Sequence, residues 1–141
     1  MIRLVIDTDV MVAAFDSPFG ASRQLLLAAL DGRFRPLLST PLMVEYESVL
    51  CRPANLEKFG IGVVEVLAVL DELAAICIPV AFDYRWRPSG ADADDELVIE
   101  TAINGQADAI ATFNLRHIGE AARRFGITAE RPGSVLRRIR T

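Results

Sequence analysis

Short apolar runs alternate with segments of helical periodicity along the chain, and this alternation limits the possible folds more than any other feature of the sequence. Residues 2–6 form a nearly continuous apolar run, with Arg3 as the exception, and the run ends at Asp7. Such a run is typical of a strand buried on both faces of a parallel sheet. Strands that alternate with helices indicate an α/β sandwich with a largely parallel central sheet.

The same patterns place the individual elements. Strands are predicted over residues 2–6, 36–39, 76–82, 109–112 and 127–129. Helices are predicted over residues 22–30, 41–51, 63–74, 94–104 and 118–125, with a breaker-rich loop over residues 53–62 and a connection over residues 84–91. Pro79 lies in the strand 76–82 and cannot donate a backbone hydrogen bond, so that strand is expected at an edge. Gly105 is expected to end the helix that precedes it.

The composition predicts one packed domain over residues 1–141. The chain is 52% hydrophobic and 24% charged, which excludes a disordered segment. Residues 63–82 are about as long as a membrane span, but Glu65, Asp71 and Glu72 interrupt them. The apolar run at the N-terminus is too short for a signal-peptide core. We therefore expect a cytoplasmic protein without membrane contact, in which Cys51 and Cys77 are buried, reduced thiols.

The charged residues favour carboxylate chemistry and contact with an anionic partner. His117 is the only histidine, so a histidine-rich metal site is excluded. Arginine is suited to bidentate phosphate contacts, so a basic C-terminal region fits nucleic-acid handling. A solvated face or a protein contact explains it equally well. The arginines after residue 115 are Arg116, Arg123, Arg124, Arg131, Arg137, Arg138 and Arg140.

Polar residues follow two of the predicted strands. Asp7 comes after the strand 2–6, and Thr112 and Asn114 come at the end of the strand that begins at residue 109. Ligands of open α/β sheets bind outside the carboxyl ends of the strands, so these residues are site candidates. Asp9 lies in the turn that opens the next element. It is interpreted either as a helix cap or as a residue that positions a ligand.

Two further carboxylates lie on the apolar stripes of predicted helices. Glu45 shares the stripe of its helix, whereas Glu47 lies on the polar face. Asp95 precedes apolar residues at helical spacing, and Glu96 and Glu100 are expected on the solvent face of that helix. A carboxylate on an apolar stripe is costly unless it is paired or hydrogen-bonded.

Asp92 and Asp94, just before Asp95, fit helix caps or first-turn charges, and Asp94 fits a carboxylate cluster nearly as well. Several convergent carboxylates without a histidine ligand point to Mg²⁺ or Mn²⁺. Such a cation can position water and neutralise charge during phosphodiester hydrolysis.

Four segments in order resemble the motifs of the PIN-domain family: residues 4–10, 42–50, 92–96 and 106–114. Each motif alone is weak, but their order and spacing make a strong joint signal over most of residues 2–129. The resemblance implies a PIN-like three-layer α/β/α sandwich, RNA cleavage that depends on a divalent metal, and frequent homodimers. The most similar subgroup consists of VapC-like toxins of toxin-antitoxin pairs, which implies a protein antitoxin as a partner.

The resemblance also implies roles for particular residues. Asp7, Glu45 and Asp95 correspond to the family's metal-binding acids, and Asn114 takes the place of a fourth catalytic acid that is often aspartate. Asp9 stands where the family often has asparagine. An amide oxygen at position 114 can still coordinate a metal or hold a water.

Three residues near the fourth motif are candidates for substrate contact. Thr112 is expected to contact RNA through its hydroxyl, and Arg116 is a candidate for a phosphate contact or for a surface role. His117 is interpreted either as a hydrogen-bonded structural residue or as a proton donor.

Two other functions fit parts of the sequence. Asp7 and Asp9 mimic the nucleophile and acid of a haloacid-dehalogenase-type phosphatase, with Thr40, Lys58 and the pair Asp94 and Asp95 in tolerable order. Against this, Asp95 lies at the beginning of a predicted helix, whereas the acidic pair of that family ends a strand. The second alternative is a non-catalytic PIN module that binds RNA or a partner protein, with Asn114 as the mark of lost activity.

Overall fold

The computed structural model describes residues 1–82 and 93–140. Its five strands form one sheet in which every neighbouring pair is parallel, in the order β3-β2-β1-β4-β5. The strands are β1 (Arg3–Ile6), β2 (Arg35–Ser39), β3 (Ile78–Val80), β4 (Ala109–Ala111) and β5 (Thr128–Glu130). The predicted α/β fold with a parallel sheet is therefore confirmed, and β3, which contains Pro79, lies at an edge as predicted.

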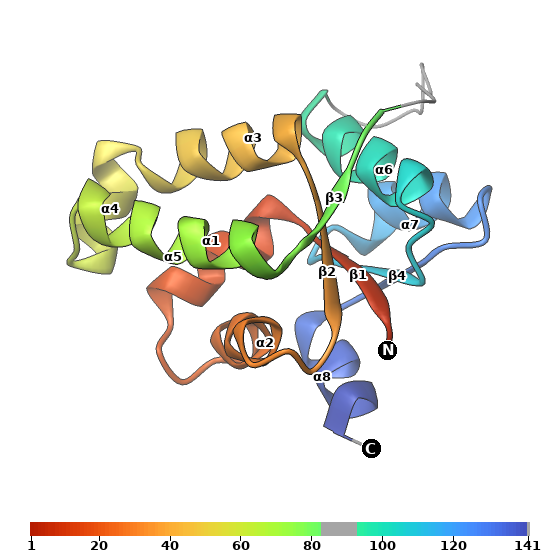
Figure 1. Cartoon of the computed structure of the whole chain (residues 1–141), viewed down its shortest axis with the longest axis horizontal. Helices are drawn as coiled ribbons and strands as arrows, with labels where there is room; N and C mark the ends of the chain where they lie inside the picture. Colours follow the sequence, from red (N-terminus) through yellow and green to blue (C-terminus); the bar gives the residue numbers. More distant parts are fainter. Residues whose placement is uncertain (83–92, 141) are drawn as a thin grey trace.

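Helices cover both faces of the sheet, as the three-layer prediction requires. The helices are α1 (Thr8–Asp16), α2 (Ala21–Leu30), α3 (Thr40–Leu50), α4 (Pro53–Phe59), α5 (Val63–Ile76), α6 (Ala93–Asn104), α7 (Leu115–Arg123) and α8 (Pro132–Arg140). Figure 1 shows α1, α3, α4 and α5 on one side of the sheet and α6 and α7 on the other, while α8 packs against α2. None of the described helices is long and apolar enough to cross a membrane.

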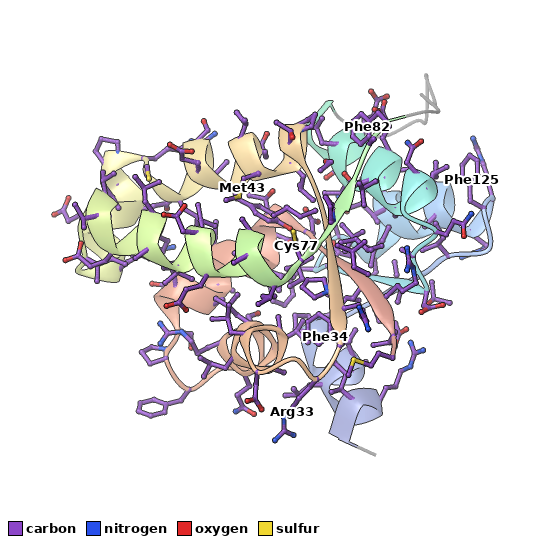
Figure 2. All side chains as sticks on the ribbon, viewed as in Figure 1. Arg33, Phe34, Met43, Cys77, Phe82 and Phe125 are labelled. Carbon is purple, nitrogen blue, oxygen red and sulfur yellow. The ribbon has the colours of Figure 1, made fainter. Side chains whose placement is uncertain are left out.

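The central strand β1 forms the middle of the core. Leu4 and Val5 have no exposed surface, and the facing Ile110 of β4 has none. Figure 2 shows Phe34 buried at the start of β2, whereas its neighbour Arg33 points to solvent. Arg3, the exception in the apolar run, is half-buried, and its Nη2 donates to the carbonyl of Gly105 at 2.7 Å. The guanidinium thus satisfies a carbonyl at the C-terminus of α6.

Three helices differ from the prediction. Residues 53–62 were predicted as a loop, but Pro53–Phe59 form α4. The breakers in this segment mark helix ends, because Pro53 occupies the first turn and Gly60 ends the helix with a φ of 73°. The sequence patterns predict neither α1 nor α8. The predicted connection over residues 84–91, Asp92 and the side chain of Asp94 lie outside the described part of the chain.

Gly105 ends α6 for a different reason from the predicted one. The residue with positive φ is Gln106, at 53°, so Gly105 does not supply the left-handed conformation. Instead, a Cβ at position 105 would lie 2.9 Å from Leu37 Cδ1, 2.9 Å from Val80 Cγ2 and 3.0 Å from the Thr101 carbonyl oxygen. The glycine therefore permits the end of α6 to pack against β2 and β3.

Gly105→Ala is expected to lower the free energy of unfolding by about 1–3 kcal/mol, because the added methyl overpacks a crowded site. Urea unfolding followed by circular dichroism measures this loss. The matched control is Gly119→Ala within α7, where the new Cβ would meet only Ala129 at 3.8 Å. That change is expected to raise stability by about 0.4–1 kcal/mol. Equal effects of the two changes would contradict the crowding argument.

The two cysteines are free thiols, and both are half-buried rather than fully buried as predicted.

Candidate active site

The site begins where the chain reverses its direction across the sheet. From β1 the chain proceeds to β2 and β3 on one side, and it returns to β4 on the other side of β1. Open α/β sheets bind ligands at such a switch point, outside the carboxyl ends of the strands. Asp7 follows β1 and Thr112 follows β4, and the backbone N–H of Asp7 donates to the Ala111 carbonyl at 2.9 Å. The register of the two strands therefore places Asp7 beside Thr112.

Asp7 is a buried carboxylate with an acidic neighbour. Only 6% of its surface is exposed, and the Thr112 hydroxyl donates to its Oδ2 at 2.7 Å. Burial, and then the charge of Asp9, raise the pKa of Asp7 from 3.8 to about 7, although the bond from Thr112 opposes the shift. Negative charge is therefore poorly compensated at this point, as expected of a residue that holds a cation.

Asp9 fixes the loop after β4. Its Oδ2 accepts a hydrogen bond from the backbone N–H of Phe113 at 3.1 Å. Asp9 lies in the first turn of α1, and Asp7 occupies the N-cap position, so the interpretation of Asp9 as a helix cap is wrong. The other oxygen of Asp9, Oδ1, is buried and has no hydrogen-bond partner among the described residues. Burial is the main cause that raises the pKa of Asp9.

Helix α3 brings Glu45 to the same place. Glu45 is half-buried and Glu47 is exposed, which confirms their predicted faces. The adjacent Tyr46 is 1% exposed, and its hydroxyl donates to the carbonyl of Ile6, the residue before Asp7. Burial and the charge of Asp7 raise the pKa of Tyr46 well above 10, so the hydroxyl keeps its proton. This bond ties the helix that carries Glu45 to the end of β1.

Asp95, in the first turn of α6, contacts Asn114. The Asn114 Nδ2 donates to Asp95 Oδ2 at 3.0 Å, and the Asn114 backbone N–H donates to Thr112 Oγ1 at 2.9 Å. Asn114 lies at the N-cap of α7, but its side chain does not cap that helix. The amide therefore orients Asp95 through its nitrogen, and its oxygen is left for a ligand or a water.

Glu96 and Glu100 are buried, which contradicts their predicted position on the solvent face. Glu96 is 9% exposed and Glu100 is 1% exposed. Helix α6 packs against α3, α7, β1, β2 and β4, so burial extends well beyond one stripe. Residues 98–102 are accordingly buried without interruption. Helical periodicity in a sequence identifies one buried face of a helix, and it does not indicate whether a second element packs against another face.

One cavity of about 270 Å³ collects the predicted acids. Its lining consists of Asp7, Thr8, Asp9, Val12, Glu45, Val49, Arg52, Asp95 and Asn114, and we call it the acidic cavity. The structure thus brings together Asp7, Glu45, Asp95 and Asn114, which come from four different regions of the sequence.

Arg52 is the functional candidate that the sequence reasoning missed. Arg52 lies in the turn between α3 and α4, where it occupies the N-cap position of α4. No helical spacing links it to Glu45 or Val49, so the sequence carried no pattern that would have singled it out. Arg52 supplies a cation at the edge of the acidic cavity.

The three candidates for substrate contact take different positions. Thr112 has no exposed surface, so its hydroxyl lies behind the wall of the acidic cavity, and direct contact with substrate is not its role. It positions Asp7 and Asn114 instead. Arg116 and His117 are exposed and do not line the acidic cavity. The predicted phosphate contact of Arg116 therefore lies outside this cavity.

Comparison with known proteins agrees with this geometry. A model of the PIN-domain family matches residues 3–116. This chain belongs to the PIN-domain family. No curated protein matches the chain. PIN domains are generally nucleases, so at this coarse level the chain that carries the acidic cavity is a hydrolase.

PIN domains typically depend on a divalent metal, and the donors in this PIN domain fit a hydrated one. Among the side chains that the structure describes, which do not include that of Asp94, no three acidic, histidine or cysteine residues are grouped closely enough to hold an ion together. Mg²⁺ usually takes only one or two protein carboxylates and keeps several waters, so it does not need a closed cage. The buried Oδ1 of Asp9 and the raised pKa of Asp7 show where positive charge is missing.

Proposed function

We propose that this PIN domain is a ribonuclease that hydrolyses RNA phosphodiester bonds with Mg²⁺ or Mn²⁺. The observation that carries the proposal is the acidic cavity, which is lined by carboxylates from α3, α6 and the end of β1 together with Arg52. Carboxylate oxygens are hard donors, which suit these two cations. An acidic cavity repels RNA unless cations are present, so a bound cation and Arg52 both favour substrate binding.

Asp7, Glu45 and Asp95 are the residues that would hold the cation, one or two of them directly and the rest through its waters. When bound, it supplies Lewis-acid polarisation of the scissile phosphate and a water of lowered pKa. The chain itself orients these carboxylates. Thr112 holds Oδ2 of Asp7, and the amide of Asn114 holds Oδ2 of Asp95. Each of these bonds selects one orientation of a carboxylate before substrate arrives, which reduces the reorganisation needed during reaction.

Arg52 is suited to bind the scissile phosphate. A guanidinium makes paired hydrogen bonds to two phosphate oxygens and cannot lose its charge near neutral pH. At the edge of the acidic cavity it would neutralise the charge that builds up on the phosphate as the attacking and leaving oxygens come into line.

The function is tested by cleavage of a mixed pool of single-stranded and structured RNA in Mg²⁺, Mn²⁺ or EDTA. The wild type is expected to cut only with metal, and Asp95→Asn is expected to lose more than the roughly 10–100-fold typical of outer-shell changes. The control is Asp71→Asn, which changes an exposed carboxylate of α5 and is expected to leave the rate unchanged. Binding of RNA by a folded wild type that never cuts it would favour the non-catalytic PIN module.

The structure does not favour the phosphatase alternative. Neither Thr40 nor Lys58 lines the acidic cavity, and the Lys58 Nζ lies 3.7 Å from Asp16 Oδ2 in an ion pair. Asp95 lies within the first turn of α6 and not at the end of a strand. The ammonium group of Lys58, which would stabilise a phospho-aspartate on Asp7 in such a phosphatase, therefore pairs with Asp16 instead.

We further propose that the protein is the toxin of a toxin-antitoxin pair, with a protein antitoxin, a homodimeric state and a cytoplasmic location. The resemblance of the chain to the VapC-like subgroup of PIN domains supports the toxin role. Exposed apolar side chains such as Phe19 and Val64 support a protein interface. Growth arrest by the wild type but not by Asp95→Asn tests the toxin role, and light scattering of the purified protein tests the dimer.

A further inference from the structure

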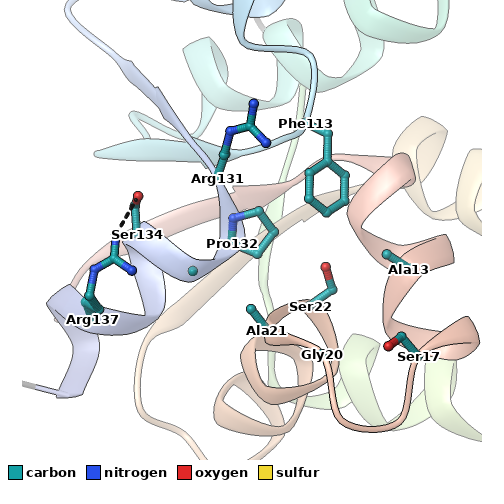
Figure 3. A pocket seen from close by; sticks show the side chains of 11 residues that line it. Ala13, Ser17, Gly20, Ala21, Ser22, Phe113, Arg131, Pro132, Ser134 and Arg137 are labelled. Atoms are coloured by element: carbon teal, nitrogen blue, oxygen red, sulfur yellow. Dashed lines mark hydrogen bonds between the residues drawn. The ribbon is translucent and has the colours of Figure 1, made fainter.

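A second cavity of about 390 Å³ lies beside the acidic cavity and contains no catalytic residue. It is bounded by α1, α2, α8 and the loop after β4, and Figure 3 shows its side chains. Its size falls within the roughly 300–1,000 Å³ of ordinary small-molecule sites. We call it the arginine cavity. Its lining consists of Ala13, Ser17, Gly20, Ala21, Ser22, Phe113, Arg131, Pro132, Gly133, Ser134 and Arg137.

The charge of the arginine cavity is the reverse of that of the whole protein. The chain carries a net charge of −4, yet the described residues of this lining include two arginines and no acid. Arg131 and Arg137 are both exposed, and Arg137 is held by a hydrogen bond from its Nη2 to Ser134 Oγ at 3.2 Å. An anion is the ligand that such a lining favours.

Two helix N-termini and a buried hydroxyl add donors to the same cavity. Helices α2 and α8 both begin in its lining, and neither has an acidic residue in its first turn. The dipoles of both helices attract negative charge. The free N–H groups come mainly from α2, because α8 begins at Pro132 and the N–H groups of Ser134 and Val135 donate to the Arg131 carbonyl. Ser22 carries a hydroxyl and is only 5% exposed. Figure 3 shows this hydroxyl pointing into the cavity, toward the space between Arg131 and Phe113.

An aromatic ring forms another part of the wall. Phe113 keeps 44% of its surface exposed, which is high for a large apolar side chain, and Figure 3 shows its ring across from Arg131 and Pro132. Aromatic faces next to cationic groups bind single-stranded nucleic acid, because bases stack on the ring while the cations contact the backbone. The arginine cavity thus combines a stacking surface with phosphate donors.

The two cavities adjoin each other. Val12 lines the acidic cavity, and the next residue, Ala13, lines the arginine cavity. Likewise, Asn114 lines the acidic cavity, and the preceding residue, Phe113, lines the arginine cavity. The bond from the Phe113 N–H to Asp9 Oδ2 joins the two walls at this point. The walls of the two cavities are therefore in direct contact.

We propose that the arginine cavity is a nucleotide subsite for the RNA strand whose scissile phosphate lies in the acidic cavity. One base stacks on Phe113, and its phosphate contacts Arg131, Arg137 and the N-termini of α2 and α8. This inference rests on the proposed ribonuclease function and adds that the substrate is single-stranded beside the cut. Both arginines lie beyond residues 3–116, which match the family.

The test measures RNA binding in EDTA, so that cleavage does not interfere. A fluorescein-labelled 12-nucleotide oligouridylate is titrated with wild type, with Arg131→Gln/Arg137→Gln and with the control Arg123→Gln/Arg124→Gln, by anisotropy at several salt concentrations. The cavity variant is expected to weaken binding about tenfold and to reduce the salt slope by roughly 0.7, because one phosphate contact is lost. The control removes two exposed arginines at the end of α7 and is expected to change binding less than twofold.

A third variant, Ser22→Ala, tests the hydroxyl without changing charge, and circular dichroism establishes that each variant is folded. Unchanged binding by the folded cavity variant, or an equal loss in the control, overturns the subsite. Uridine monophosphate that binds as tightly as the 12-mer identifies a free-nucleotide site instead and also overturns it. So does a hexaglutamate peptide that binds more tightly than RNA and requires the same arginines, since that result indicates an acidic protein partner.

Cleavage with metal is measured in parallel, which separates the two proposals. Arginine-dependent binding without any cleavage by the wild type would refute the ribonuclease function while supporting the RNA subsite. Metal-dependent cleavage by the wild type, with RNA binding that does not depend on Arg131 and Arg137, would support the ribonuclease function and refute the RNA subsite.

Discussion

Asp7→Asn is expected to abolish metal-dependent RNA cleavage and, in EDTA, to make the protein more stable than the wild type. Cleavage is lost because the amide is a poor ligand for Mg²⁺, and the loss should exceed the roughly 10–100-fold seen for outer-shell residues. Stability rises because the amide removes a buried charge. The bond from the Thr112 hydroxyl can remain, since the asparagine oxygen accepts it as the carboxylate does.

The sign of the stability change follows from the pKa of Asp7. Its pKa in the folded protein is about 7, against 3.8 for the ordinary group, so the folded state binds more protons between these values. The contribution of Asp7 is therefore most favourable below pH 4, and it is lost as the pH rises toward 7. At pH 7.5 in EDTA the variant should gain on the order of 2–4 kcal/mol over the wild type, with little difference at pH 4.

Urea unfolding at the two pH values, with and without Mn²⁺, measures this prediction. Mn²⁺ should raise the stability of the wild type, because it binds only the folded site, and it should raise that of Asp7→Asn much less. Asp71→Asn on the exposed face of α5 is the control for removal of any single charge. A variant that is less stable than the wild type in EDTA at pH 7.5 would show that the Asp7 carboxylate is stabilising without metal.

Tyr46→Ala should cause the largest loss of stability among the changes considered, about 3–5 kcal/mol, because it empties a fully buried position of α3. Tyr46→Phe keeps the ring and should cost about 1–3 kcal/mol, since the Ile6 carbonyl loses its donor. The phenylalanine variant should also lower kcat/KM by about tenfold, because the bond holds Glu45 in register with Asp7, and small displacements of catalytic groups are costly.

The control for this prediction is Leu70→Ala, a core change in α5 away from the acidic cavity. Leu70 is 1% exposed, and its truncation should cost about 2–5 kcal/mol. Cleavage is measured well below the unfolding temperature of each variant, so that every protein is folded. If Leu70→Ala slows cleavage as much as Tyr46→Phe does, the hydroxyl has no particular role in positioning Glu45.

Much of the candidate site could be predicted from local pattern. Asp7 ends an apolar run, and a polar residue at the end of a buried parallel strand faces the ligand-binding edge of the sheet. Glu45 and Asp95 share apolar helical stripes, which indicated that their helices turn these carboxylates toward other elements. All three residues do line one cavity.

Other features could not be predicted, because they depend on which distant segments meet. Glu96 and Glu100 were placed on the solvent face, but α6 has neighbours on several sides, and periodicity reports only one. Gly105 was interpreted as a turn glycine, whereas the approach of Leu37 and Val80 requires it. Thr112 was expected to contact substrate, but the pairing of β1 with β4 buries it behind Asp7.

The sequence by itself determined the parallel α/β sheet and the main acids, since both depend on the order of residues within one strand or helix. Only the tertiary structure decided that Arg131, Arg137, Ser22 and Phe113 line one cavity. These residues come from α8 and the residue before it, from α2 and from the loop after β4, and no spacing along the chain connects them. Packing of α8 against α2 brings them together, and that packing depends on the shape of two helix surfaces rather than on any local pattern.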